Sequence, residues 1–145
     1  MANIKVDISE LNKFTAQVKN TALEFNKNTK VAIRNSALNI KKEASNNLKN
    51  NKSVVTGHLR RSIATNIQDF SAEIGTNVKY GICVEEGTKS HLIKPKKGKF
   101  LYWKGAKHPV KFVKHPGSKA KPFLEPAFKN EVPILLKNIE ESIKW

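Results

Sequence analysis

The sequence predicts one α+β domain over residues 1–145, with a long N-terminal helical segment, a small antiparallel sheet built from two hairpins, and a C-terminal helix. Three observations support this class. Near both ends of the chain, apolar residues recur every three to four positions, which is the period of a helix. Between these regions the period changes to two, which is typical of strands. Turn residues separate the short runs of period two, so hairpins are expected.

The helical pattern begins at Ser9 and continues to about Asn50. Leu11, Phe14 and Val18 form a first apolar stripe, which predicts a first helix with Ser9 as its N-cap. A longer stripe predicts a second helix of roughly 25 residues. The second stripe consists of Ala22, Phe25, Thr29, Ile33, Ala37, Ile40, Ala44 and Leu48. A helix with one narrow apolar stripe must lie against a partner, either a small sheet or a neighbouring subunit.

Two short strands are predicted after a polar loop. The stretch "NLKNNKSVVTG" ends in Thr56 and Gly57 and is typical of a loop. Apolar and smaller side chains then alternate over 63–67 and again over 72–76, with Gln68 to Ser71 as the turn between them. A single hairpin is only marginally stable, so it needs the helix or further strands as a partner.

The stretch "VKYGICVEEGT", from Val78 to Thr88, has two interpretations. Its apolar residues alternate as in a strand, but they also fit one face of a short helix that ends at Gly87. The short helix is the preferred interpretation. Cys83, between two apolar residues, is expected to be a small buried side chain.

Residues 89–121 contain eleven lysines and no carboxylate, whereas the whole chain carries +15, so the remaining residues contribute only +4 (15 − 11). This segment is expected to be mobile. Inside it, "KFLYW" and "VKFVK" are predicted to pair as a second hairpin, because Gly105 and Pro109 separate two runs of β-forming residues. The flanks "KSHLIKPKKG" and "KHPGSKAK" are predicted to be loops.

Helical spacing resumes at the C-terminal end. Pro122 or Pro126 suits the first turn of a helix, whereas Pro133 is expected to kink or break it. The apolar stripe of this helix consists of Phe128, Val132, Leu135, Ile139 and Ile143.

The composition indicates a strongly basic protein made in a reducing compartment. A single cysteine excludes an internal disulfide, no run of about 20 apolar residues predicts a membrane span, and the N-terminal residues do not have the pattern of a signal peptide. There are 24 lysines against three arginines, Arg34, Arg60 and Arg61. Because arginine is the residue suited to reading base edges, any contact with DNA is expected to be independent of sequence.

No catalytic, metal-binding or cofactor-binding pattern is found. The histidines His58, His91, His108 and His115 do not have the tight spacing of metal ligands, and three of them lie in the lysine segment, where a cation is repelled. Glu85 and Glu86 are adjacent and therefore point in different directions. No glycine-rich phosphate loop leads into a helix. The sequence therefore predicts no enzyme.

Aromatic residues lie between the lysines of the segment. Phe100, Tyr102, Trp103 and Phe112 would suit stacking on single-stranded bases, but they would equally suit the buried face of a hairpin. Packing is the preferred interpretation. For the lysines, an anionic partner and a solvated loop are equally supported.

Three motifs follow the long helix in order: "VVTGHLRRSI", "IGTNVKYGICVEEGT" and "HPGSKAKPFLEPAF". This series resembles the tail-completion, or head–tail joining, minor structural proteins of long-tailed bacteriophages. The resemblance covers most of the chain, from the first helix to the last. Each motif alone is a weak signal, whereas three at compatible spacing are more specific. The matching residues are Thr56, Gly57, Leu59, Arg60, Ser62 and Ile63, then Tyr80, Val84, Glu85, Gly87 and Thr88, and finally Pro122, Phe123, Leu124, Pro126 and Ala127.

The chain departs from the family pattern in two places. Members often have an alanine after the tyrosine and an aromatic residue after the glutamate, where this chain has Gly81 and Glu86. Many are also shorter between the second and third motifs, where this chain has its lysine segment.

The resemblance implies a non-catalytic α+β protein at the neck or upper tail of a virion, assembled in the cytoplasm of the bacterial host. It implies a homo-oligomeric ring, expected to be a hexamer, that contacts adjoining neck and tail proteins and no membrane. The motif residues are expected to pack rather than react. Gly57 and Gly87 would allow sharp turns, Pro122 to Leu124 would begin the last helix, and Arg60 and Glu85 would form a charge pair or remain independent surface charges.

Two uses of the lysine segment remain open under this hypothesis. It would either line a passage for genome DNA, contacted without sequence preference, or order against an acidic neighbouring protein. The alternative hypothesis is a free, non-sequence-specific nucleic-acid-binding protein. In each case the residues expected to face DNA or a partner are Lys89, Lys94, Lys96, Lys97, Lys99, Lys104, Lys107, Lys111, Lys114, Lys119 and Lys121.

Overall fold

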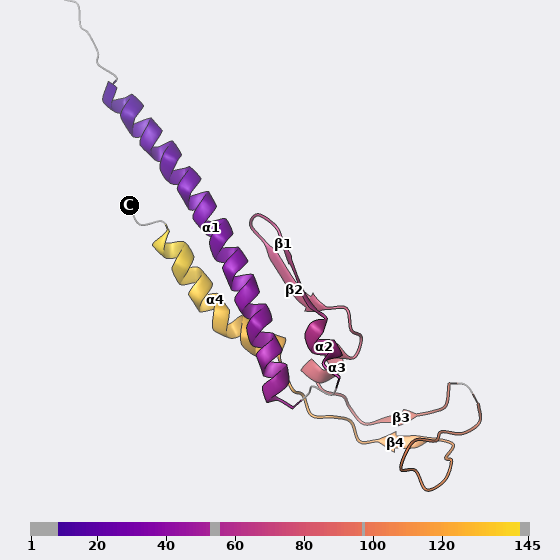
Figure 1. Ribbon diagram of the computed structural model, residues 1–145. Helices are drawn as coiled ribbons and strands as arrows, with labels where there is room; N and C mark the ends of the chain where they lie inside the picture. Colours follow the sequence, from indigo (N-terminus) through magenta and orange to yellow (C-terminus); the bar gives the residue numbers. More distant parts are fainter. Residues whose placement is uncertain (1–8, 53–55, 97, 143–145) are drawn as a thin grey trace, which may run out of the picture.

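The computed structural model describes residues 9–52, 56–96 and 98–142 and confirms the α+β class (Figure 1). Helices α1 (Ser9–Asn50) and α4 (Leu124–Glu141) lie side by side. The first hairpin, residues 63–76, lies along α1, whereas the second, residues 91–115, extends beyond the C-terminal end of α1. The predicted residues Ile143 and Lys97 lie outside the described residues. The elements are α1 (Ser9–Asn50), α2 (His58–Arg61), β1 (Ile63–Ile67), β2 (Ala72–Thr76), α3 (Gly81–Glu85), β3 (His91–Ile93), β4 (Val113–His115) and α4 (Leu124–Glu141).

The N-terminal segment is one helix of 42 residues, so the predicted division into two helices is wrong. No proline or glycine occurs between Ser9 and Asn50, and therefore nothing interrupts the backbone hydrogen bonds where the two stripes meet. The two stripes lie on the same side of one long helix.

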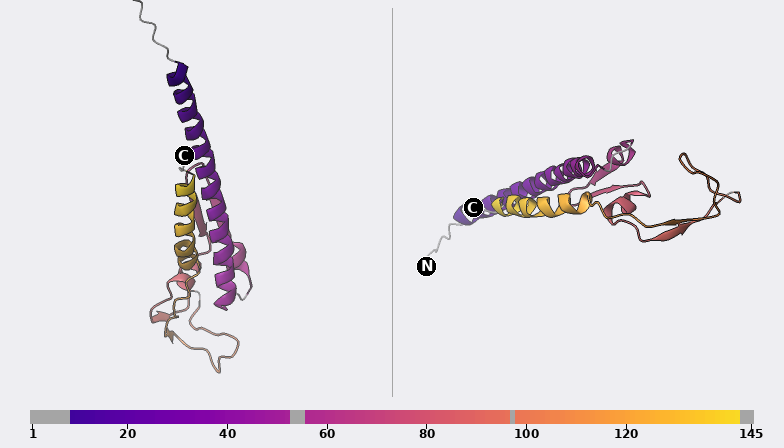
Figure 2. Two further views of the ribbon diagram at one scale, coloured as in Figure 1. Left: turned by 90° about the vertical axis from the view of Figure 1, so that its left-hand side faces the viewer. Right: turned by 90° about the horizontal axis from the view of Figure 1, so that it is seen from below.

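Helix α4 packs antiparallel along the C-terminal half of α1 (Figure 2). The amide of Asn47 donates to the carbonyl oxygen of Phe123 at 3.1 Å, and the amide of Asn39 donates to Oε1 of the buried Glu131 at 3.1 Å. The residue number of the contact decreases along α1, from 47 to 39, as it increases along α4, from 123 to 131, so the two helices are antiparallel. The helix continues through Pro133, so the predicted break does not occur. Pro133 is exposed, on the side of α4 away from the core.

The first predicted hairpin is confirmed. Strands β1 and β2 pair antiparallel from Ile63↔Thr76 to Ile67↔Ala72. The turn between them is attached to α1, because the Lys30 ammonium lies 2.7 Å from Oδ2 of Asp69. The same ammonium lies 5.1 Å from the centroid of the Phe70 ring.

The core is small and lies where α1, α4, β1 and α2 meet. Helix α2 was not expected from the sequence; it places Leu59 in this core. In contrast, every residue of α1 from 9 to 20 is exposed, because α4 ends before reaching them (Figure 1). The buried cluster consists of Ile40, Ala44, Leu48, Leu59, Ile63, Phe123 and Ala127.

The second hairpin forms its own two-stranded sheet, in a different place from the one predicted. Strands β3 and β4 pair from His91↔His115 to Ile93↔Val113, so β3 lies in a flank predicted to be a loop. "KFLYW" contributes only the single bridge Leu101↔Val110. Pairing is regular close to the body of the protein, where the bridge Thr88↔Ser118 fixes the register, and it becomes sparse towards the end of the hairpin. We call residues 89–121 the basic arm.

Candidate functional site

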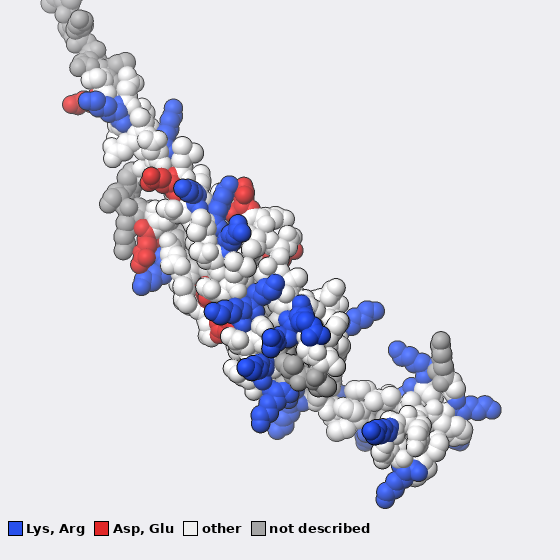
Figure 3. Space-filling view, viewed as in Figure 1, with Lys and Arg blue, Asp and Glu red and all other residues white. Residues whose placement is uncertain are grey.

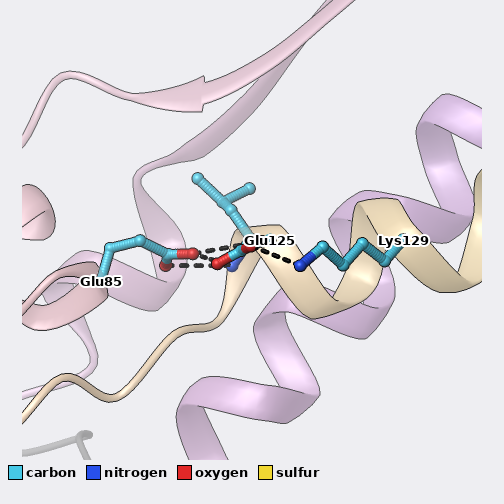
Figure 4. Close-up of polar contacts among 4 residues, drawn as sticks. Glu85, Glu125 and Lys129 are labelled. Atoms are coloured by element: carbon cyan, nitrogen blue, oxygen red, sulfur yellow. Dashed lines mark hydrogen bonds and ion pairs between the residues drawn. The ribbon is translucent and has the colours of Figure 1, made fainter.

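The three sequence motifs meet at the start of α4, where Leu59 and Ile63 share the core with Phe123. The carboxylate of Glu85 caps the helix there (Figure 4). Its Oε2 accepts from the backbone N–H of Phe123 at 2.8 Å, and its Oε1 accepts from that of Glu125 at 2.8 Å. The N–H of Leu124 lies 3.2 and 3.1 Å from the two oxygens. The first N–H groups of a helix have no partner inside it, and a negative charge there also interacts favourably with the positive end of the helix dipole. Glu85 therefore supplies both the acceptors and the charge.

The expected pair between Arg60 and Glu85 does not form. Among the described residues, the three ion pairs are Lys30–Asp69, Lys129–Glu125 and Lys137–Glu141. Arg60 is exposed, whereas the Glu85 oxygens are occupied by the backbone of α4. A guanidinium is not needed, because three peptide donors already solvate this carboxylate.

Most motif residues have packing or hydrogen-bonding roles, as expected. Leu59, Ile63, Phe123 and Ala127 are buried in the core, with Val84 and Leu124 packed against it. The remaining motif residues act on the backbone or lie in turns. The Ser62 hydroxyl donates to the Leu59 carbonyl, and Thr56 Oγ1 accepts from the His58 N–H. The Pro122 carbonyl accepts from the Asn51 amide. Pro126 lies in the first turn of α4, and Tyr80 precedes α3 and is half exposed.

Two glycines allow the two chain segments at the base of the basic arm to approach each other closely. Gly87 ends the α3 segment at φ +76°, and a Cβ there would lie 2.6 Å from the Ser118 carbonyl oxygen and 2.7 Å from the Ala120 nitrogen. Gly117, at φ +93°, would direct a Cβ into the Thr88 carbonyl oxygen. Gly57 adopts φ +73° immediately before α2, so the sharp turn expected there is the start of this short helix.

Replacing Gly87 with alanine is expected to destabilise the protein, because the atoms that a Cβ would meet are backbone atoms that cannot rotate away. We expect a loss of about 2 kcal/mol or more, of which roughly 1 kcal/mol comes from the left-handed backbone conformation. Gly105→Ala is the matched control, since Gly105 has φ +100° but no atom within 4 Å of a Cβ. Thermal unfolding measures both variants, and equal shifts would exclude a role for close packing at Gly87.

The basic arm carries uncompensated charge. None of the ion pairs found in residues 9–52, 56–96 and 98–142 includes an arm lysine. Figure 3 shows the arm as a separate lobe with lysines projecting in several directions and no acidic group on the visible face. Such a surface attracts polyanions without selecting a sequence.

The aromatic residues of the arm are exposed, so the preferred packing interpretation is wrong. The exposed fractions are 53% for Phe100, 70% for Tyr102, 50% for Trp103 and 58% for Phe112. No described residue between Thr88 and Lys121 is buried. The hairpin extends away from the body, and the rings therefore have no core to enter (Figure 1).

A second unpartnered surface lies at the free end of α1. Leu11 and Phe14 are each 61% exposed and Val18 is 39% exposed. They continue the side of α1 that packs on α4 further down, but no other described segment covers them. We call these three residues the N-terminal stripe.

Reactive chemistry is sparse in the described part of the chain. No group of three or more histidine, cysteine or acidic side chains there is arranged to hold a metal ion. Cys83 is exposed, contrary to the expectation that it would be buried. None of the described helices combines the length and apolar character needed to cross a bilayer.

Sequence reasoning missed the amide side chains that join the two long helices. Asn39 and Asn47 lie on α1, and Asn51 directly follows it. All three look like solvated polar residues in the sequence, so nothing there indicates that each has a partner. The position of Glu131 did indicate a partner, because it follows Ala127 by four positions and therefore lies on the same, buried face of α4. In comparisons with known proteins, no family model, no curated protein and no solved structure matched this chain.

Proposed function

We propose that this chain is a structural protein of a bacteriophage virion that completes the tail or joins the head to the tail. It would act in the neck or upper tail by assembling with copies of itself, in an expected hexameric ring, and with adjoining virion proteins. The proposal rests on the three-motif resemblance and on one structural observation. Two surfaces that no other described segment covers, the N-terminal stripe and the basic arm, project from opposite ends of one elongated body.

This arrangement suits a component of an assembly. Large apolar side chains that face water on a projecting helix indicate a surface that is covered in another state. The small core lies between the two projections, so contacts at either end need not disturb it. The motif residues are consistent with a component of an assembly, since they stabilise the body and the base of the arm and leave the two projecting surfaces for contacts with other proteins.

The test is electron microscopy of a lysate from a phage whose copy of this gene carries a stop codon at Lys49. Filled heads and separate tails, both present but unjoined, are expected. Supplying the intact gene from a plasmid should restore complete particles. Intact, infectious particles from the stop-codon phage would overturn the proposal.

The N-terminal stripe gives a prediction for self-assembly. Leu11→Ser combined with Phe14→Ser should reduce self-association at least tenfold while leaving thermal unfolding unchanged, because both side chains are exposed. The control is Leu23→Ser combined with Leu38→Ser, two exposed apolar residues on the other side of α1 by helical spacing. Sedimentation velocity measures the oligomeric state, and an equal loss in both variants would show that the stripe has no specific role.

The alternative function, free non-sequence-specific nucleic-acid binding, is favoured by the uncompensated lysines of the basic arm. It predicts binding to unrelated duplexes with a logarithmic salt slope of about −0.9 per phosphate contact. Complete particles in the stop-codon lysate together with such binding would favour this alternative.

A further inference from the structure

We propose that the basic arm binds single-stranded nucleic acid, with its lysines contacting phosphates and its exposed aromatic rings stacking on bases. The inference goes beyond the virion role and concerns the arm alone. It is therefore tested on the purified protein, and its failure would leave the assembly test untouched.

The charge of the arm specifies a polyanion. Residues 89–121 carry eleven lysines and no aspartate or glutamate. Within the described residues, no ion pair neutralises an arm ammonium. Binding a phosphate backbone releases the counterions condensed on it, which makes such contacts favourable at low salt. The same lysines carry no information about base identity.

The aromatic rings specify a single strand. In a duplex the faces of the bases are hidden by their neighbours, whereas a single strand presents them to any flat partner. Tyr102 and Trp103 are adjacent in the turn that follows the bridge Leu101↔Val110, and Phe100 and Phe112 lie on the two chain segments that this bridge joins. All four are at least half exposed. Rings that are open to solvent beside lysines provide both contacts that a single strand offers.

The hairpin presents these groups at a distance from the body. The bridge Thr88↔Ser118 and the β3–β4 pairs hold its base, and the bridge Leu101↔Val110 holds its two chains together close to the aromatic residues. Figure 2 shows the arm extending beyond both long helices. A strand can therefore lie along the arm without meeting α1 or α4.

The composition of the arm favours nucleic acid over an acidic protein surface. Protein–protein interfaces are enriched in arginine together with tyrosine and tryptophan, and they are depleted in lysine. The arm has eleven lysines and no arginine, since the arginines of the chain are at positions 34, 60 and 61. Without arginine there is also no fork to read base edges, so binding is independent of sequence.

The experiment measures fluorescence anisotropy of three labelled probes with the full chain at several salt concentrations. The probes are an oligothymidylate, a mixed-sequence duplex of the same length, and polyglutamate as an acidic polypeptide. We expect the oligothymidylate to bind at least about tenfold more tightly than the other two. It should also quench the emission of Trp103 in a Trp145→Phe background, because a stacked base lies against the indole ring.

Two variants separate the two contacts. Tyr102→Ala combined with Trp103→Ala should weaken oligothymidylate binding at least about tenfold and leave the salt slope unchanged. Lys99→Gln, Lys104→Gln and Lys107→Gln together should reduce the magnitude of that slope by about 0.7 per lost contact. Lys13→Gln, Lys19→Gln and Lys27→Gln, which change the same charge on exposed positions of α1, should leave binding nearly unchanged.

Three results would overturn the inference. Absence of oligothymidylate binding at low salt would do so directly. Equal binding of the oligothymidylate and the duplex, with no loss in the Tyr102→Ala and Trp103→Ala variant, would show that the arm binds polyanions by charge alone. Tightest binding to polyglutamate would assign the arm to an acidic protein partner.

Discussion

Phe123→Ala is expected to lower the free energy of unfolding by about 3–5 kcal/mol, the usual cost of removing a buried aromatic ring and leaving a cavity. Phe123 is 1% exposed and joins the apolar cluster of α1, β1 and α4. Because natural domains are stable by only about 5–15 kcal/mol, this single change removes a large part of the total. At roughly 3 °C per kcal/mol for a chain of this size, the melting temperature should fall by about 9–15 °C.

The structure offers a control on the same helix. Phe128 is the same residue type but is 57% exposed, and Phe128→Ala should therefore cost less than about 1 kcal/mol. Thermal unfolding followed by circular dichroism compares the two variants at the same protein concentration. Similar shifts in melting temperature for both would contradict the placement of Phe123 in the core.

Glu85→Ala is expected to cost about 2–3 kcal/mol, because it leaves three N–H groups at the start of α4 without their acceptor, and those of Phe123 and Leu124 are partly buried. Glu85→Gln keeps the shape and one acceptor oxygen but removes the negative charge, which interacts favourably with the positive end of the helix dipole. We expect the glutamine variant to lose about 1–2 kcal/mol, intermediate between wild type and alanine.

Glu86 provides the matched control for this cap. Glu86→Gln raises the net charge by the same amount at the neighbouring position, but Glu86 is exposed and should change stability by less than about 0.5 kcal/mol. Chemical denaturation measures the three variants. If Glu86→Gln were as damaging as Glu85→Gln, the effect would be one of net charge and not of the cap. Hydrogen exchange at Phe123, Leu124 and Glu125 should accelerate only in the Glu85 variants.

These two predictions concern one junction, and its position explains why the motifs occur together. Glu85 ends a short helix that leads into the basic arm, and it holds the first turn of the helix that follows the arm. The chain therefore leaves the body and returns to it within a few residues of the same carboxylate. A stable junction of this kind allows the arm to vary in length and charge without disturbing the core.

Sequence patterns predicted the elements whose signal is local. The α+β class, the hairpin β1–β2, the short helix α3 and the helix after Phe123 follow from hydrophobic period and turn residues. The predicted division of α1 into two helices was wrong because the two stripes join at ordinary helical spacing, from Val18 to Ala22, and no proline or glycine interrupts the backbone hydrogen bonds there. The missed α2 is a single turn, too short to show a period.

The candidate site was predicted in its residues but not in their contacts. Glu85 was identified by its motif, yet its partners are backbone groups up to 40 positions away, and no side-chain pattern marks a backbone donor. The choice of Arg60 as its partner relied on opposite charge alone. The preference for packing of Tyr102 and Trp103 was wrong, since an alternating run fits a buried face and an open one equally well.

The sequence by itself determined the types of the main elements, the concentration of lysine in one segment and the absence of arginine there, because these depend only on neighbours along the chain. The tertiary structure decided which carboxylate caps α4, that α4 covers only half of α1, and that the rings of the arm face solvent. These depend on where each element ends in space and on what remains to pack against it. The relative positions of separate elements are set by the fold of the whole chain, and the local periodicity of apolar residues does not contain them.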